Sequence, residues 1–130
     1  MFSISSHAAP NLFYKITFQN GYFKNGYSLS ESSFKEFGGV FTLNRLHDGR
    51  VTDVQILTQK THSQMKMDFI RIVEALKLSD KTRKIASCAN FVSIQTQTKE
   101  QSFCVDSLDG KDRDLYNKWL SQARRYLRRI

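Results

Sequence analysis

Residues 41–57, FTLNRLHDGRVTDVQIL, decide the fold class of this chain. Their central Asp48-Gly49 pair supplies the positive φ angles that a two-residue hairpin turn needs. This turn places four apolar side chains on one face of the hairpin, with Leu43 opposite Val54 and Phe41 opposite Ile56. Polar residues take the other face: Thr42, Asn44, Asp53 and Gln55. The alternation predicts an antiparallel pair that covers a core with one face.

Alternation and turn residues elsewhere predict further strands. The period of two is clear in residues 12–18, and an Asn25-Gly26 pair interrupts residues 22–29. Residues 30–39 are expected to form a loop. Seven candidate strands result: 12–18, 22–29, 39–46, 51–58, 69–76, 91–97 and 102–108.

Residues 65–78 fit two structures. On a helical wheel their apolar side chains gather in one sector, opposite Asp68, Arg71 and Glu74, and this periodicity favours a helix. A strand through residues 69–73 stays open, because β-branched side chains are common there.

The chain ends in an amphipathic helix that Asp109 or Asp112 can cap. One stripe carries its apolar side chains: Leu115, Tyr116, Trp119, Leu120, Ala123, Tyr126, Leu127 and Ile130. The expected fold is therefore α+β, an antiparallel sheet or half-barrel of about seven strands closed by this helix. If residues 65–78 are helical, the alternative is two ββα units, formed by residues 40–78 and by residues 91–130.

The chain has 130 residues, of which 40% are hydrophobic and 12% aromatic, and this suits one folded domain. We expect a flexible arm over residues 1–11 and a single globular domain over residues 12–130. The arm lacks the basic start and the apolar run of a secretory signal, and no apolar stretch is long enough to span a membrane. These observations predict a cytoplasmic protein that can associate with a membrane surface.

Two cysteines, Cys88 and Cys104, lie 16 residues apart. A hairpin of residues 91–97 and 102–108 with its turn at residues 98–101 places Cys104 opposite Gln95 and leaves Cys88 beyond the ladder. This register predicts that the two sulfur atoms do not meet, and that both thiols are reduced and mostly buried.

The net charge of +8 concerns the partners of the protein. Over half of the excess lies in residues 111–129, where seven Lys and Arg residues outnumber Asp112 and Asp114. The helix dipole explains part of this order, but four Arg among the last seven residues exceed what it requires. A second group lies in residues 81–84, and scattered Lys residues precede it. The predicted ligand-binding residues are Lys15, Lys24, Lys81, Arg83, Lys84, Lys118, Arg125 and Arg129.

No pattern of residues predicts chemistry. His7, His47 and His62 are scattered, without a carboxylate or thiol at the spacing of a metal or nucleophile site. Phosphate-binding glycine loops and hydrolase motifs are not found either. We therefore expect a protein that is not an enzyme, with no cofactor, no metal and no catalytic residue.

Residues 90–94 and 102–105 followed by a helix with Trp119 resemble the end of a pleckstrin-homology domain, which closes with two antiparallel strands and a helix bearing a Trp. Lipid-binding members of that family carry a Lys and a [Lys/Arg]-x-Arg group near the first hairpin. Lys15 and Lys24 lie in that region, but no Arg completes the group. The resemblance implies a binding module for a phosphoinositide or for a protein.

The expected function is attachment to anionic lipid headgroups or a membrane surface through these basic residues. The alternative is a protein-protein interaction module or inhibitor that docks an acidic partner. Binding of nucleic acid is the third hypothesis, since aromatic residues lie among the Lys residues of the first third of the chain.

Overall fold

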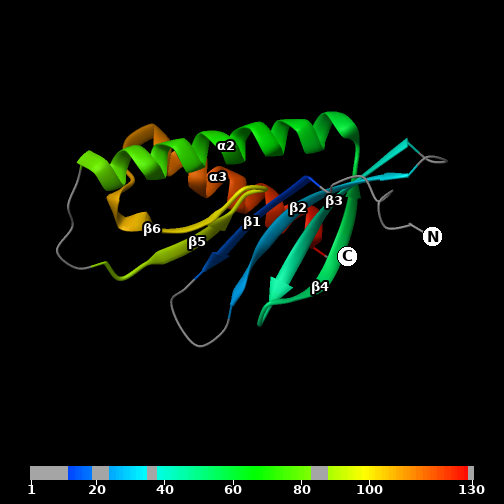
Figure 1. The fold of residues 1–130 in the computed structure, drawn as a ribbon, viewed down its shortest axis with the longest axis horizontal. Coiled ribbons are helices and arrows are strands. Elements are labelled where there is room, and N and C mark those ends of the chain that lie inside the picture. The colour runs from blue at the N-terminus through cyan, green and yellow to red at the C-terminus, as the bar shows by residue number, and fades with distance from the viewer. Residues whose placement is uncertain (1–11, 19–23, 35–37, 83–87, 129–130) are drawn as a thin grey trace.

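The computed structural model describes residues 12–18, 24–34, 38–82 and 88–128. Within these ranges six strands form one antiparallel sheet in the order β4-β3-β2-β1-β5-β6. The strands are β1 (Leu12–Phe18), β2 (Asn25–Phe34), β3 (Gly38–His47), β4 (Arg50–Leu57), β5 (Phe91–Gln95) and β6 (Glu100–Cys104). Helix α2 (Gln59–Thr82) follows β4, and the short 3-10 helix η1 (Val105–Ser107) leads from β6 into α3 (Gly110–Leu127). The fold is α+β, as predicted (Figure 1).

Both helices pack against the same face of the sheet (Figure 1). Trp119 of α3 lies at the centre of this packing and is 2% exposed. Its indole Nε1–H donates to the carbonyl oxygen of Met65 in α2 at 2.9 Å, and its ring meets Phe69 and Tyr27 edge to face. The buried apolar residues form one cluster that joins the sheet to both helices. Hydrophobic burial on one sheet face thus holds the molecule together.

Residues 65–78 lie within α2, so the helical interpretation is confirmed and the strand at residues 69–76 is wrong. The described part of the chain has six strands, and its sheet is open with β4 and β6 at the edges. Two ββα units are present, β3-β4-α2 and β5-β6-α3, as the alternative predicted. Strands β2 and β1 lie between the two units in the sheet.

The β3-β4 hairpin turns at Asp48-Gly49 with positive φ at both residues, as predicted. The predicted pairing holds only next to the turn. A register shift between Arg45 and Leu46 then pairs Phe41 with Leu57. Such a bulge moves every later side chain of β4 to the other face. Val54 and Ile56 are therefore exposed instead of buried, and their predicted place in the core is wrong.

Several element boundaries differ from the prediction, among them β6, which ends at Cys104 and gives way to η1 over residues predicted as strand. Residues 30–34 continue β2 and Gly38 begins β3, so residues 30–39 are not a loop throughout. Asn25-Gly26 starts β2 instead of interrupting a strand, and a Cβ atom at Gly26 would clash with the carbonyl oxygen of Ile16. Glycine permits this close pairing of β1 with β2. In α3, Tyr126 of the predicted apolar stripe is 37% exposed. Residues 1–11, the predicted arm, lie outside the described residues.

Cys88 and Cys104 form a disulfide bond, with their Cα atoms 6.0 Å apart, so the prediction of two reduced thiols is wrong. The predicted turn was too late in the sequence. The N–H of Thr96 donates to the carbonyl oxygen of Lys99 at 2.9 Å, which ends β5 at Gln95 and pairs Phe91 with Cys104. Cys88 then lies three residues before the partner of Cys104 and reaches it.

Candidate functional site

The C-terminal half of α3 supplies most cations of the candidate site. Tyr116, Trp119, Ala123 and Leu127 are buried against the sheet and α2. The helical period leaves the positions between them exposed, and these hold Lys118, Arg124, Arg125 and Arg128. Two cations from other elements join them, Arg45 of β3 and Lys60 of α2. We call these residues the basic end: Arg45, Lys60, Lys118, Arg124, Arg125 and Arg128.

The first part of the basic end is a groove between the two helices, with a volume of about 280 Å³. It places the start of α2 beside the end of α3, so the helices run antiparallel here. Lys60, Lys118 and Arg125 lie in it together with the half-exposed ring of Tyr126. One carboxylate, that of Asp68, also lines it. The groove carries net positive charge and one exposed aromatic ring.

The second part is a shallow hollow of about 640 Å³ between α3 and β3. Its lining is Arg45, Ser121, Arg124, Arg125 and Arg128, so four of its five residues carry a guanidinium group. Arg45 is held by Asp53 of β4, whose carboxylate accepts from Nη1 at 3.1 Å. Nη2 of Arg124 donates to the hydroxyl oxygen of Ser121 at 3.4 Å. Arginine offers two parallel donors, so this hollow suits carboxylate or phosphate groups.

The N-terminus of α2 adds to the positive potential, whereas the last turn of α3 beside it is the negative end of its own helix dipole. Helix α2 begins at the basic end with no acidic residue in its first turn. Its first N–H groups are capped by a neutral side chain, because the hydroxyl oxygen of Thr58 accepts from the N–H of Thr61 at 3.2 Å. The positive end of the α2 dipole is therefore not neutralised by a local carboxylate.

The structure brings together only two of the eight predicted ligand-binding residues, Lys118 and Arg125. Lys15 alternates with the core residue Ile16, so it points to the sheet face that the helices do not cover. Lys24 precedes β2, and its carbonyl oxygen accepts from the N–H of Gly49 at 2.8 Å. Lys81 belongs to the last turn of α2, roughly 30 Å along the helix from Lys60. The remaining three, Arg83, Lys84 and Arg129, lie outside the described residues.

Four residues of the basic end were not among the predicted ligand-binding residues: Arg45, Lys60, Arg124 and Arg128. Arg124 and Arg128 were counted in the basic run of the last helix but were not assigned to the site. Arg45 had a signal, because it continues the alternation of Phe41 and Leu43 and so belongs to the helix-covered face. A charged residue in that series marks the point where the covered face reaches solvent. Lys60 had none, since the start of α2 was not predicted.

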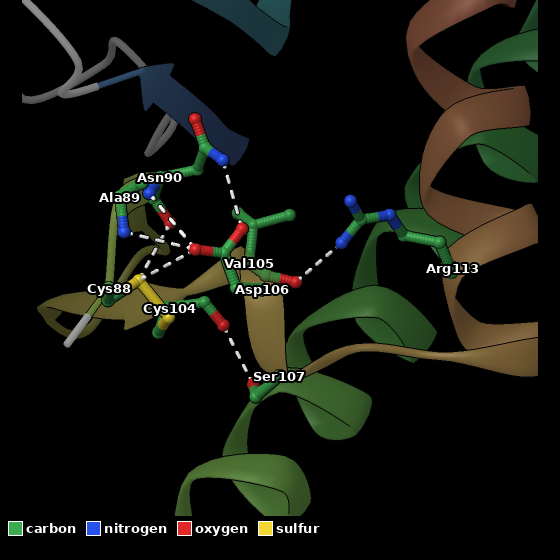
Figure 2. The surroundings of a disulfide bond; sticks show 8 residues. All are labelled: Cys88, Ala89, Asn90, Cys104, Val105, Asp106, Ser107 and Arg113. Carbon is green, nitrogen blue, oxygen red and sulfur yellow. Dashed lines mark hydrogen bonds between the residues drawn. A yellow bond between two sulfur atoms is a disulfide. The ribbon is translucent and has the colours of Figure 1, made fainter. Parts of the chain in front are cut away.

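A second cluster surrounds the disulfide at the other edge of the sheet (Figure 2). The carboxylate of Asp106 accepts from the Ala89 N–H at 3.0 Å and from the Asn90 side-chain amide at 2.9 Å. The hydrogen bond from the Asn90 side-chain amide is the main reason that the pKa of Asp106 lies below its usual range, and the bond from the Ala89 N–H adds to it. Nη1 of Arg113 donates to the Val105 carbonyl oxygen at 2.8 Å, which joins α3 to η1. Asp106 lies close to both sulfur atoms, but neither offers a thiolate ligand while they are bonded to each other.

His62 is buried in α2 against Phe41, with ring centroids 4.9 Å apart. Burial lowers the pKa of His62, and Lys66 adds to this, while Glu31 and the Ser30 backbone act in the opposite direction. Its Nε2 atom has no hydrogen-bond partner among the described residues. His62 is therefore a neutral core residue near the basic end.

Comparison of the chain with family models, with curated proteins and with solved structures finds no match. Among the described residues, neither helix combines the length and the apolar character that a membrane-spanning helix needs.

Proposed function

We propose that the protein is a non-enzymatic binding module that docks an acidic protein on its basic end. The observation that carries this proposal is the hollow in which Arg45, Arg124, Arg125 and Arg128 meet. Two elements far apart in sequence hold these side chains in one place, so the charge is concentrated and not spread along a helix. Carboxylates of a partner can pair with several guanidinium groups at once.

The shape of the site supports a protein partner over a bilayer. The cations surround a hollow and a groove, which suit protruding side chains, and Lys15 lies on the other face of the sheet. Anionic lipid, the partner expected from the sequence, is the second candidate. Tyr126 favours it, because an exposed aromatic ring beside Lys118 and Arg125 fits the interface of a membrane.

The disulfide supports a proposal about location. Disulfide bonds persist in oxidising compartments and are rare in the cytosol. We therefore propose that the protein acts in an oxidising compartment, in place of the cytoplasm that the sequence analysis expected. The resemblance to pleckstrin-homology domains and a half-barrel closed by α3 stay hypotheses, and the proposed function depends on neither.

Charge reversal tests the proposal. The variant Arg124→Glu/Arg128→Glu removes cations from the hollow, and Lys99→Glu/Lys111→Glu makes the same change in net charge at exposed residues outside it. Binding of fluorescent oligoglutamate to the full chain is measured by anisotropy at low salt. We expect the first variant to weaken binding at least about tenfold and the control to change it by less than about twofold. Equal losses in both variants would show attraction by net charge alone, and would refute the proposal.

The same pair of variants separates the other candidates. Vesicles of phosphatidylserine and phosphatidylcholine test the lipid candidate against vesicles of phosphatidylcholine alone. A single-stranded oligonucleotide tests nucleic acid, for which a steep dependence on salt is expected. If only the anionic vesicles, or only the oligonucleotide, distinguish the two variants, that ligand replaces the acidic protein.

A further inference from the structure

Strand β4 is an edge of the sheet, because only β3 pairs with it in the part of the chain that the structure describes. Beyond the bulge, residues 53–57 pair with β3 in regular register. An edge strand presents unpaired N–H and C=O groups, and proteins that avoid association usually protect such edges with Lys, Pro or inward-pointing charges. Residues 53–57 contain no Lys and no Pro, and their one charge, Asp53, is engaged with Arg45.

The open face of this edge is apolar. Val54 is 56% exposed and Ile56 is 68% exposed, on the sheet face opposite the helices. Their partners on β3 are Asn44 and Thr42, of which Asn44 is buried and donates to the Ser28 and Ser30 hydroxyl oxygen atoms. At this edge, β4 therefore presents two large apolar side chains where the residues opposite them on β3 are polar.

The other face of the same edge is cationic. The last turns of α3 pack over β3 and β4. Arg124 and Arg128 lie there with Arg45, and the single carboxylate of Asp53 does not balance the three charges. A segment beside β4 would thus meet positive charge on its helix side and two aliphatic side chains on its open side.

We propose that β4 accepts an extended segment of the acidic partner as an additional strand, in which acidic and apolar side chains alternate. The acidic side chains face Arg124 and Arg128, and the apolar ones cover Val54 and Ile56. Backbone hydrogen bonds to β4 supply affinity, and the two faces supply specificity. This inference rests on the proposed function and names its binding mode. A second copy of the chain fits less well, because pairing two β4 edges brings two sets of arginines together and each chain carries a net charge of +8.

Peptides of about eight residues, enough to span β4, test the inference on the full chain. The probe is an alternating Glu-Val peptide, and the control has the same composition with all Glu before all Val. Two further versions carry N-methyl groups on every Glu or on every Val, so that each blocks hydrogen bonding along a different edge of the peptide. We expect the alternating peptide to bind at least about tenfold more tightly than the block peptide, and one N-methyl version, not both, to lose that advantage.

Protein variants complete the test. Val54→Thr/Ile56→Thr keeps the strand but removes its apolar face, and Met67→Thr/Leu78→Thr makes the same change at exposed positions of α2. We expect the β4 variant alone to weaken the alternating peptide at least about fivefold, with binding of oligoglutamate unchanged.

Failure of the inference and failure of the proposed function can be told apart. If oligoglutamate still distinguishes Arg124→Glu/Arg128→Glu from its control, but the alternating and block peptides bind equally, the basic end binds anions without strand addition. If Arg124→Glu/Arg128→Glu changes the binding of neither oligoglutamate nor the alternating peptide relative to its control, both proposals are refuted. A dimer in sedimentation with protected β4 amides would make a second copy the occupant and overturn the inference.

Discussion

The two edges of the sheet end in different ways. β6 has five residues and ends at Cys104 of the disulfide, directly before Asp106 and η1, so covalent and polar ties fix the end of this edge strand to the chain before β5. β4 has eight residues, is tied to β3 by the ion pair of Asp53 with Arg45, and exposes Val54 and Ile56. Both strands belong to ββα units of the same topology. The topology therefore does not decide which edge can pair with another strand. That depends on the side chains beyond the bulge in β4 and on the residues that follow β6.

Removal of the disulfide has the largest expected effect on this comparison. In the variant Cys88→Ser/Cys104→Ser the unfolded chain regains the freedom of a loop of 16 residues. We expect the free energy of unfolding to fall by about 3 kcal/mol. Urea denaturation measures the loss, and hydrogen exchange shows where it falls.

The amides of β5 and β6 should exchange through local opening that costs less free energy than global unfolding. Those of β3 and β4 should still exchange only through global unfolding. Reduction of the unmodified protein with dithiothreitol is the matched control and should give the same pattern. Equal loss of protection in both ladders would show that the edges belong to one cooperative unit, and the contrast between them would fail.

The second expected difference between the edges is the pH at which each loses stability. His62 packs on Phe41 beside the end of β4, and burial lowers its pKa from 6.5. The unfolded chain then binds a proton at higher pH than the folded one, so stability falls as pH decreases below about 6.5. Thermal unfolding between pH 7 and pH 5 should show this loss. His62→Phe keeps a ring against Phe41 and should remove the dependence, and an unchanged pH profile would exclude His62 as its source.

Asp106 gives the β6 edge a later and smaller response to acid. Hydrogen bonds from Asn90 and Ala89 lower its pKa from 3.8, so the stability that they confer is present above that pH and is lost as pH falls below it. The protection of the β5 and β6 amides, relative to an unstructured chain at the same pH, should therefore fall only below about pH 4. In Asp106→Asn, which cannot form the carboxylate, protection should already be reduced at pH 7 and should not change further. Acceleration of wild-type exchange near pH 6 would contradict this assignment.

Short-range patterns predicted one central strand, one hairpin turn and one helix. β1 has the predicted bounds, and the turn at Asp48-Gly49 and the helix at residues 65–78 were also predicted. Alternation cannot reveal a bulge, because one extra residue leaves the pattern of each strand intact and changes only their pairing. The prediction thus placed Val54 and Ile56 in the core, and the open apolar edge was missed for that reason.

The same kind of error hid the disulfide. The prediction placed the β5-β6 turn too close to Cys104, so it paired Cys104 with Gln95. In the structure Cys104 pairs with Phe91. In the basic end, charge patterning identified α3, but Arg45 reaches the hollow through sheet pairing and helix packing. Such long-range contacts depend on register, which a local pattern does not fix.

The smallest expected effect on stability tests the register of β4, through the exposed position of Ile56. If Ile56 were in the core, Ile56→Thr would cost roughly 1–3 kcal/mol through lost packing and a buried hydroxyl. Because Ile56 is 68% exposed, we expect its free energy of unfolding to stay within about 0.5 kcal/mol of the unmodified protein. Ile72→Thr, at a position 2% exposed in α2, is the matched control that should show the larger loss. The edge itself should still respond, because a polar residue at position 56 makes pairing between chains less favourable, and light scattering at high concentration should fall. A substantial loss of stability in Ile56→Thr would return this residue to the core and restore the register without a bulge.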